Sequence, residues 1–269
     1  MVIQYSHVTI AYGAETAVQD ISFGLEPGKV LCIVGESGSG KSTIIKAPLG
    51  LLGPGGAVIE GSINFAGLNL PELAPARLRP LAGPGISMVF QNSEVSFMPL
   101  RTFGAQIYEA LAAHISISRK EAEEQAASVL GQLGFTKPKK ILASRPFELS
   151  GGMNQRVALS LPFLLRPRLL LADEPTSALD ALTGKAVLKE LDRLRQEAGT
   201  AIILVTHDMR VARRMADDIL VLRQGRTEEY GPAGEVLKSP RSAYTQELLA
   251  AAPVLKPSPL GKGDRISSG

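Results

Sequence analysis

The stretch VLCIVGESGSGKST, residues 30–43, decides the fold of this chain. Its first part is an uncharged run of branched residues that predicts a buried strand, and GESGSGKST matches the pattern G-x-x-x-x-G-K-[ST]. Gly35, Gly38 and Gly40 allow a tight loop whose amide groups point toward one anion, and a helix that starts near Lys41 adds its positive end. The stretch therefore predicts a strand, a phosphate-binding loop and a helix.

The phosphate loop supplies a cation and a metal ligand in addition to its amides. Lys41 would reach the β- and γ-phosphates of a nucleotide, and the Ser42 hydroxyl would ligate Mg²⁺. The predicted nucleotide-binding residues of the loop are Gly35, Glu36, Ser37, Gly38, Ser39, Gly40, Lys41, Ser42 and Thr43. A chance glycine loop would lack the strand and the helix that flank this one.

Five apolar runs, VLCIV among them, predict the strands of a parallel sheet, because central strands of such a sheet are buried on both faces. The runs are VLCIV (30–34), ISMVF (86–90), LLLA (169–172), AIILV (201–205) and DILVL (218–222). Helical patterns follow several of them, most clearly at residues 181–199. The predicted fold class is therefore α/β with a doubly wound, mostly parallel sheet.

Three further segments have different patterns. Apolar and polar residues alternate at 2–12, 17–25 and 57–65, as in half-exposed antiparallel strands. Residues from about 100 to 165 have helical periodicity between apolar strands, so we expect a helical insertion there. Pro48 and Pro162 fall inside expected helices, where a proline kinks or breaks the helix.

A second chemical motif, LLLADEPTSALD, occupies residues 169–180. The apolar strand delivers Asp173 to the sheet edge where ligands bind in open α/β folds, so Asp173 would hold Mg²⁺ through water. Glu174 is then placed to accept a proton from the attacking water. An isolated acidic pair is ordinarily a solvated surface pair, but the strand end and the phosphate loop favour the catalytic interpretation.

LSGGMNQR, residues 149–156, looks like a second anion cradle in a chain that already has one. Ser150, Gly151 and Gly152 offer a hydroxyl, exposed amides and a helix N-terminus, with no lysine of their own. This is half of an anion site. A plain helix cap by Ser150 is the alternative, and the two roles are compatible.

Composition limits the remaining classes of function. A net charge of +3 on 269 residues, without a long basic run, argues against nucleic acid as a partner. The single cysteine, Cys32, excludes an internal disulfide and fits a reducing compartment, where we expect a packed, inert thiol. The N-terminus shows no secretion signal, and no apolar patch reaches the ~20 residues that span a bilayer.

In this order and spacing, GESGSGKST, Gln91, LSGGMNQR, LLLADEP, SALD and THD resemble the nucleotide-binding subunit of ATP-binding cassette (ABC) transporters. The resemblance covers about residues 2–250. It implies a P-loop NTPase core at 1–91 and 166–252, with an N-terminal antiparallel β-subdomain and a helical signature subdomain at 92–165. It also implies ATP and Mg²⁺ as cofactors and ATP hydrolysis as the reaction. The proline, glycine and serine content of residues 253–269 predicts a flexible tail.

The resemblance explains why one chain has two anion cradles. Cassettes of this family pair head to tail, so Ser150, Gly151 and Gly152 would contact the γ-phosphate held by a partner cassette. Asp180 would lie across the dimer seam and shape the partner's site.

Three more roles are implied by position. Gln91 resembles the glutamine that touches Mg²⁺ and the attacking water, and His207 resembles the histidine that contacts the γ-phosphate and supports Glu174. Tyr12 resembles the aromatic residue that stacks on adenine, although a strand-edge tyrosine remains an open alternative.

The motifs PFELSGGMNQR and SPRSAYTQELLAAAP resemble the peptide and nickel importers within the family. The implied partners are a second cassette, expected to be a paralogue, two transmembrane permease subunits and, indirectly, an extracytoplasmic substrate-binding protein. The expected location is the cytoplasmic face of the inner membrane, and the cargo is a peptide, nickel or a metal–chelator complex. The C-terminal region lacks the cysteines for an iron–sulfur cluster, so none is predicted. Residues 92–99, NSEVSFMP, depart from the family pattern in the loop that faces the permease.

Other classes of protein share parts of this pattern. A P-loop kinase for a small metabolite would have the phosphate loop but no use for LSGGMNQR. Soluble cassettes of DNA repair or translation carry long coiled coils or two cassettes in one chain. A degenerate cassette that binds ATP without hydrolysis would not need Glu174 and His207.

Overall fold

Six strands form the central sheet, in the order β10-β9-β3-β8-β7-β6, within the residues that the computed structural model describes, 1–91 and 96–251. They are β3 (Val30–Val34), β6 (Ile86–Val89), β7 (Leu169–Asp173), β8 (Ala201–Val205), β9 (Asp218–Arg223) and β10 (Arg226–Pro232). All run parallel to their neighbours except β10, which pairs antiparallel with β9. Each of the five apolar runs supplies a strand of this sheet, so the predicted α/β fold with a mostly parallel sheet is confirmed.

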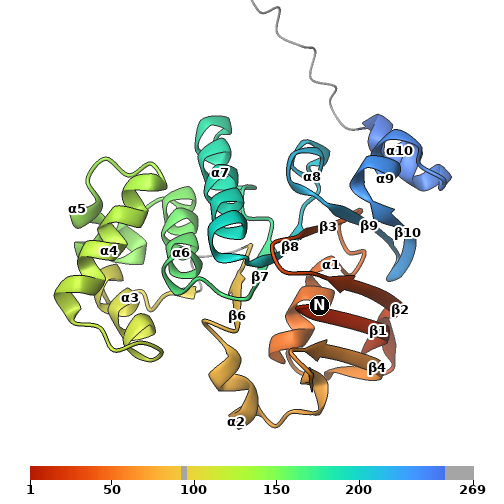
Figure 1. Ribbon diagram of the computed structural model, residues 1–269, viewed down its shortest axis with the longest axis horizontal. Coiled ribbons are helices and arrows are strands. Elements are labelled where there is room, and N and C mark those ends of the chain that lie inside the picture. Colours follow the sequence, from red (N-terminus) through yellow and green to blue (C-terminus); the bar gives the residue numbers. More distant parts are fainter. Residues whose placement is uncertain (92–95, 252–269) are drawn as a thin grey trace, which may run out of the picture.

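The two faces of the central sheet pack against different elements (Figure 1). Leu31 and Ile33 of β3 point to the face covered by α1 (Lys41–Lys46) and the second sheet. Cys32, between them, points to the other face, and burial raises the pKa of its thiol. The helices that cover this second face include α7 (Ala181–Ala198), α8 (Met209–Met215), α9 (Ala233–Lys238) and α10 (Ala243–Ala251).

The second sheet is antiparallel and has the order β2-β1-β4-β5. Its strands are β1 (Ile3–Tyr12), β2 (Glu15–Leu25), β4 (Gly56–Phe65) and β5 (Leu68–Asn69). Short pieces connect it to the central sheet, namely α2 (Pro75–Leu78) and the 3₁₀ turns η1 (Ala47–Leu49), η2 (Leu70–Glu72) and η3 (Arg79–Leu81). One face of β1 and β2 is buried against the central sheet, which explains the alternating pattern of their sequences.

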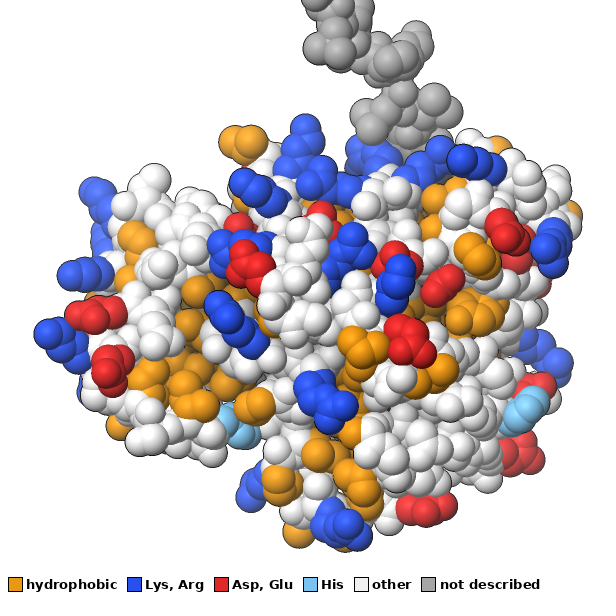
Figure 2. Space-filling view, in the orientation of Figure 1, with side chains coloured by type: hydrophobic (Ala, Val, Ile, Leu, Met, Phe, Trp, Pro, Cys, Tyr) orange, Lys and Arg blue, Asp and Glu red, His pale blue; other side chains and the backbone are white. Residues whose placement is uncertain are grey.

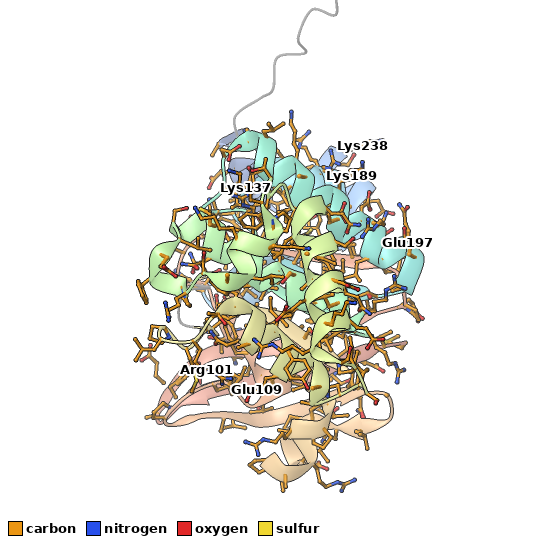
Figure 3. All side chains as sticks on the ribbon, turned by 90° about the vertical axis from the view of Figure 1, so that its left-hand side faces the viewer. Arg101, Glu109, Lys137, Lys189, Glu197 and Lys238 are labelled. Carbon is orange, nitrogen blue, oxygen red and sulfur yellow. The ribbon has the colours of Figure 1, made fainter. Side chains whose placement is uncertain are left out.

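The helices between β6 and β7 form a separate lobe, on the left in Figure 1. They are α3 (Phe103–Ala112), α4 (Arg119–Gln132), α5 (Pro138–Ala143) and α6 (Gly151–Leu165), with the 3₁₀ turn η5 (Pro146–Glu148) before α6. Phe103, Leu111, Leu130 and Val157 are among the residues of its own hydrophobic core. Figure 3 views this lobe from its outer side.

An ion pair lies within the helical lobe, and a hydrogen bond joins the lobe to the rest of the chain. Within the lobe, Arg101 Nη1 pairs with Glu109 Oε2 of α3 at 2.6 Å, and Figure 3 labels both residues in the lower part of its view. On the side of the core, Arg193 of α7 donates from Nη2 to Gln132 Oε1 of α4 at 2.7 Å. The second contact joins the lobe to a helix of the central sheet.

The helical lobe also carries exposed apolar surface. Figure 2 shows hydrophobic side chains gathered on the face of this lobe that is turned toward the viewer. Met98 and Leu100, in the segment that leads into α3, are 61% and 80% exposed. Among the described residues, no helix is long and apolar enough to cross a bilayer.

The two prolines expected inside helices behave differently. The expectation for Pro48 is wrong, because α1 ends at Lys46 and Pro48 lies in the 3₁₀ turn Ala47–Leu49, where its missing N–H leaves no helical hydrogen bond broken. Pro162 does lie inside α6, near its C-terminal end. The helix continues past it to Leu165 and ends at Arg166, whose φ is 47°. The predicted tail from residue 253 onward lies outside the described residues.

Candidate functional site

The phosphate loop runs from β3 to α1 and lines a hollow of about 610 Å³. The loop residues that line it are Ser37, Gly38, Gly40, Lys41, Ser42 and Thr43. Gly35 lies behind them with a φ of 150°, and a Cβ there would meet the carbonyl oxygen of Leu222 at 2.1 Å. Only glycine fits at this position, so β9 fixes where the loop begins.

Lys41 places a cation at the base of this hollow. Its Nζ donates to the carbonyl oxygens of Gly35 and Glu36 at 2.9 and 2.5 Å. Burial lowers the pKa of Lys41, while the nearby carboxylates of Glu174, Asp173 and Glu36 act to raise it. A partly desolvated ammonium held by backbone carbonyls is available to turn toward a phosphate.

The end of β7 brings Asp173 beside the phosphate loop. Asp173 is 4% exposed, and burial raises its pKa even though a hydrogen bond from Ser42 and the charges of Lys46 and Lys41 act to lower it. Its Oδ1 is buried and has no hydrogen-bond partner. An orphaned carboxylate oxygen next to a serine hydroxyl suits the oxygen ligands that Mg²⁺ takes, so the residues present fit this ion.

Three predicted catalytic residues meet at the mouth of the same hollow. His207 Nδ1 lies 2.9 Å from Glu174 Oε1, and Gln91 Nε2 lies 3.5 Å from Glu174 Oε2. They come from the ends of β8, β7 and β6, and all three line the hollow together with the phosphate loop. Parallel strands that end at one edge of a sheet therefore bring together residues that are far apart in sequence.

Glu174 has an unusual backbone conformation at this position. Its φ is 47°, in the left-handed region that non-glycine residues rarely adopt, and its N–H donates to Val205 O at 3.0 Å. The side chain is 15% exposed, so the carboxylate faces the hollow more than bulk water. Strained backbone at a cleft residue is typical of functional sites.

Tyr12 lies at the end of β1, and its ring packs against Gly56, where a Cβ would lie 2.8 Å from Tyr12 Cε1. It is not among the residues that line the hollow. Its partner across the strand pair, Glu15, does line the hollow, as do Thr16 and Ala17. The structure thus places Tyr12 beside the hollow, and the adenine role stays a prediction.

Sequence reasoning missed several lining residues of the hollow. Thr16 and Ala17 come from β2, and Gln224 and Gly225 come from the turn between β9 and β10. None of them belongs to a phosphate or acidic motif. The alternating pattern of β2 predicts a strand, but it gives no sign that one end of that strand borders a ligand.

The signature residues lie apart from this hollow. Ser150 caps α6, with Met153 N donating to its Oγ at 3.4 Å, and neither Ser150, Gly151 nor Gly152 is among the residues lining the hollow of the same chain. A Cβ on Gly152 would lie 2.9 Å from Ala178 O, so the segment before α7 passes close to the signature. The Ser150 hydroxyl and the N-terminus of α6 therefore lie away from the phosphate loop of the same chain.

Asp180 caps the next helix, α7. Its Oδ1 accepts from the backbone N–H groups of Leu182 and Thr183, each at 3.0 Å, and its Oδ2 accepts from Thr183 Oγ1 at 2.7 Å. The Thr183 hydrogen bonds lower the pKa of Asp180. Asp180 also lines a neighbouring hollow of about 680 Å³ that it shares with Glu174 and His207.

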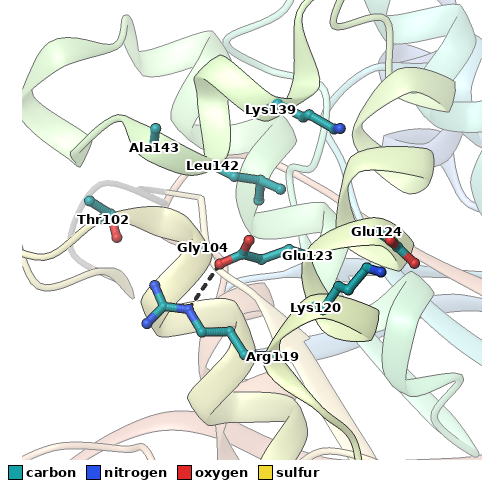
Figure 4. A pocket seen from close by; sticks show the side chains of 9 residues that line it. All are labelled: Thr102, Gly104, Arg119, Lys120, Glu123, Glu124, Lys139, Leu142 and Ala143. Carbon is teal, nitrogen blue, oxygen red and sulfur yellow. Dashed lines mark hydrogen bonds and ion pairs between the residues drawn. The ribbon is translucent and has the colours of Figure 1, made fainter.

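Another hollow, of about 510 Å³, lies between α3, α4 and α5 in the helical lobe (Figure 4). Charges of both signs line it, and Arg119 Nε is paired with Glu123 Oε1 at 2.9 Å. None of the residues predicted from sequence is in its lining. We therefore place the candidate active site at the phosphate loop, where the predicted residues converge.

Comparison with known families and proteins agrees with this placement. The family model described as ABC transporter matches residues 18–177. The oligopeptide transport ATP-binding protein OppD of Salmonella typhimurium is 42% identical over 243 residues, which span 90% of this chain and 72% of OppD. The metal-staphylopine import system ATP-binding protein CntD of Staphylococcus aureus is 35% identical over 250 residues, 93% of this chain and 92% of CntD.

Solved structures show the same similarity. The dimeric ATP-binding cassette MJ0796 bound to ADP and phosphate superimposes with a TM-score of 0.77 at 28% identity, covering 86% of this chain and 98% of that one. An ATP-binding subunit of an ABC transporter gives a TM-score of 0.77 at 26% identity, covering 93% and 98% of the two chains.

Proposed function

The chain belongs to the ABC transporter family as an ATP-hydrolysing cassette, and from this premise we propose that it powers the import of a peptide or a metal–chelator complex through a membrane permease. The observation that carries the proposal is the meeting of Gln91, Glu174 and His207 at the hollow of the phosphate loop. A regulatory cassette that only binds nucleotide has no need of a carboxylate held at this point.

Each residue has a specific task in hydrolysis. Glu174 accepts the proton of the attacking water, and His207 Nδ1 at 2.9 Å holds its carboxylate. Gln91, on the other carboxylate oxygen, orients the water. Lys41 and the loop amides neutralise the charge of the phosphates, so that catalysis is mainly positioning and electrostatic stabilisation.

Ser42, Asp173 and Gln91 would hold Mg²⁺, which supplies charge neutralisation at the β- and γ-phosphates when bound. The unpartnered Oδ1 of Asp173 supports this assignment. Burial also raises the pKa of Asp173, as expected for a desolvated carboxylate whose charge a bound cation would stabilise.

Two cassettes would bind ATP between them, with each cassette supplying one half of each nucleotide site. The phosphate loop of one binds the triphosphate, and Ser150, Gly151 and Gly152 of the other close over the γ-phosphate at the N-terminus of α6. The location of Ser150 away from the hollow of its own chain supports action on a partner. The structural neighbour MJ0796 is a dimer with ADP and phosphate bound, which supports a pair of cassettes as the working unit.

We further infer the partners and the location. Two permease subunits would contact the helical lobe near Met98 and Leu100, whose exposed apolar side chains follow Gln91 in sequence. Residues 92–95 of this loop lie outside the described residues. The chain would then lie at the cytoplasmic face of the inner membrane, next to a paralogous cassette, with an extracytoplasmic substrate-binding protein on the other side.

The proposed division of the chain follows its hydrophobic cores. Residues 92–165 would form the signature subdomain, since α3 to α6 share one core, and residues 1–91 and 166–252 would form the nucleotide-binding part. Gln91 lies at the junction, where it can transmit the state of the γ-phosphate to the helical lobe.

The cargo class rests on the names of the relatives. OppD is an oligopeptide transport protein, DppD of Escherichia coli, 37% identical over 91% of this chain, is a dipeptide transport protein, and CntD belongs to a metal-staphylopine importer. The test is phosphate release by the complete complex in proteoliposomes, with peptides, Ni²⁺ and metal chelates supplied outside. We expect one class to stimulate release. ATP binding without phosphate release under any condition would favour a regulatory cassette.

A further inference from the structure

The helix α10 (Ala243–Ala251) touches the phosphate loop, although more than two hundred residues of sequence separate them. Its residue Tyr244 is 5% exposed and packs into the core on the helical face of the central sheet. The Tyr244 hydroxyl accepts a hydrogen bond from the backbone N–H of Glu36 at 3.2 Å. The motif SPRSAYTQELL, which the catalytic mechanism does not use, therefore reaches the nucleotide site.

The peptide group between Gly35 and Glu36 is held from both sides. Its N–H donates to Tyr244, and its C=O accepts from Lys41 Nζ at 2.9 Å. A trans peptide is planar and its C=O and N–H point in opposite directions. Tyr244 and Lys41 therefore fix the orientation of one peptide plane between them.

Neighbouring strands and turns hold Tyr244 in place. The Arg223 guanidinium, at the end of β9, lies 4.7 Å from the centre of the Tyr244 ring. The backbone N–H of Tyr244 donates to Ser242 Oγ at 3.1 Å. Glu229 of β10 accepts from the backbone N–H groups of Arg241 and Ser242 at 3.0 and 3.2 Å. These hydrogen bonds fix the position of the Tyr244 hydroxyl, and the cation–π contact with Arg223 further stabilises the ring.

The strand β9 closes the remaining side of the peptide. Leu222 O lies so near Gly35 that no Cβ fits, and the next residue of β9 is the Arg223 that covers Tyr244. The start of the phosphate loop is therefore bounded by β9, α10 and Lys41. A shift of the Glu36 amide would also move the carbonyl that positions the Lys41 ammonium.

We propose that Tyr244 is a positioning residue for nucleotide binding, which orients the Gly35–Glu36 peptide, and through it Lys41, before a phosphate arrives. The inference rests on the proposed function, because it requires that this loop binds ATP. Preorganisation lowers the cost of ordering the loop and therefore acts on affinity. The Glu174 carboxylate is held by Gln91 and His207 and not by this peptide, so we expect the chemical step to change little.

The test is Tyr244→Phe, which removes one oxygen and keeps the ring against Arg223. One neutral hydrogen bond corresponds to roughly a three- to tenfold change in an equilibrium constant. We expect the Kd for Mg-ADP, measured by calorimetry on the full chain, to rise by this factor. In the assembled complex, KM for ATP should rise similarly while kcat at saturation stays within about twofold of the unaltered protein.

Tyr230→Phe is the matched control. Tyr230 lies on β10, and its hydroxyl also takes a hydrogen bond from a backbone N–H, that of Gly24, away from the phosphate loop. This variant should bind Mg-ADP as the unaltered chain does. Hydrogen exchange supplies a direct second measurement, in which the Glu36 amide of nucleotide-free Tyr244→Phe should exchange faster than in the control.

The outcomes separate the two proposals. If the unaltered chain binds no Mg-ADP, the proposed function fails. If it binds and Tyr244→Phe has the same Kd and the same exchange rate at Glu36, only the role of Tyr244 is overturned. A loss of kcat with KM unchanged would also overturn it, since that pattern places the effect on the chemical step.

Discussion

The side-chain amide of Gln155 donates a hydrogen bond of 3.0 Å to the backbone carbonyl oxygen of Glu174. Gln155 is 1% exposed and lies on α6, one turn after the signature residues. The same carbonyl accepts from Ser177, through Oγ at 3.0 Å and N–H at 3.2 Å. These bonds hold Glu174 in its left-handed conformation, and one of them comes from the helix that would bind the partner's nucleotide.

Gln155→Leu should therefore lower catalysis without removing nucleotide binding. Gln155 Oε1 is buried without a partner, so replacement by an apolar side chain of similar size removes only the hydrogen bond to the Glu174 carbonyl oxygen. That oxygen still accepts from Ser177. We expect kcat of the assembled complex to fall about tenfold, as the loss of roughly 1–1.5 kcal/mol of positioning implies, with Kd for Mg-ADP within twofold.

Asn154→Leu is the control for the preceding variant. Asn154 is the adjacent residue of α6, is equally buried, and donates to Pro146 O instead of Glu174. If both substitutions lower kcat to the same extent, the effect comes from packing of α6 and the link to Glu174 has no special role.

Glu174→Gln removes the base and keeps the size of the side chain. The amide can still accept from His207, but it cannot take a proton from water, so we expect steady-state phosphate release to fall by a factor on the order of 10²–10⁴. ATP binding should persist, and the ATP-bound pair should accumulate as a species of doubled mass in light scattering. Hydrolysis at the unaltered rate would exclude Glu174 as the base.

Much of the fold can be predicted from the sequence, because a strand buried on both faces of a sheet appears as an unbroken apolar run. This explains why β3, β7 and β8 were predictable. The strand β10 (Arg226–Pro232) was not predicted, because it is an edge strand with mostly exposed residues and no apolar alternation. Pro48 was placed in a helix because a sequence pattern does not show that α1 ends after six residues.

The site divides in a similar way. Asp173, Glu174 and His207 follow apolar strands, so parallel topology alone predicts that they gather at one sheet edge. Gln155 and Tyr244 act on backbone groups, at Glu174 and Glu36. Every residue type except proline carries the same backbone N–H and C=O groups, so the sequence does not show which of them a side chain will contact. Contacts of this kind are seen only in the folded structure.

Asp173→Asn should stabilise the nucleotide-free protein while abolishing Mg²⁺-dependent hydrolysis. Burial raises the pKa of this carboxyl above its ordinary value of 3.8, so the folded state binds its proton more tightly than the unfolded state does. Stability then falls as pH rises from about 4 through the raised pKa, and the cost is fully present once the pH lies above the raised pKa. Asparagine carries no such cost.

The measurement is thermal unfolding of both proteins without nucleotide and metal, from pH 4 to pH 8. The unfolding temperature of Asp173→Asn should exceed that of the unaltered chain at pH 8, and the difference should shrink toward pH 4. A lower unfolding temperature for the variant at pH 8 would mean that Lys41 and Lys46 stabilise the carboxylate by more than burial costs.

Ser150→Ala tests the two roles of the signature serine. Loss of a helix cap costs about 0.5–2 kcal/mol of unfolding free energy, and loss of a γ-phosphate contact lowers hydrolysis. Ser118→Ala is the matched control, since Ser118 caps α4 in the same way, with Glu121 N donating to its Oγ at 3.3 Å. We expect both variants to be destabilised in chemical denaturation, and only Ser150→Ala to lose ATPase activity.

Mixing variants then shows on which nucleotide Ser150 acts. The Lys41→Met variant lacks the cation of the phosphate loop, and the Ser150→Ala variant lacks the signature hydroxyl. A homodimer of either variant therefore contains two defective sites. If the signature completes the partner's site, a mixed pair concentrates both defects in one site and leaves the other intact, because the intact loop then faces the intact signature. Phosphate release should therefore reappear on mixing. If Ser150 acted within its own chain, each site of the mixed pair would keep one defect and mixing would restore nothing.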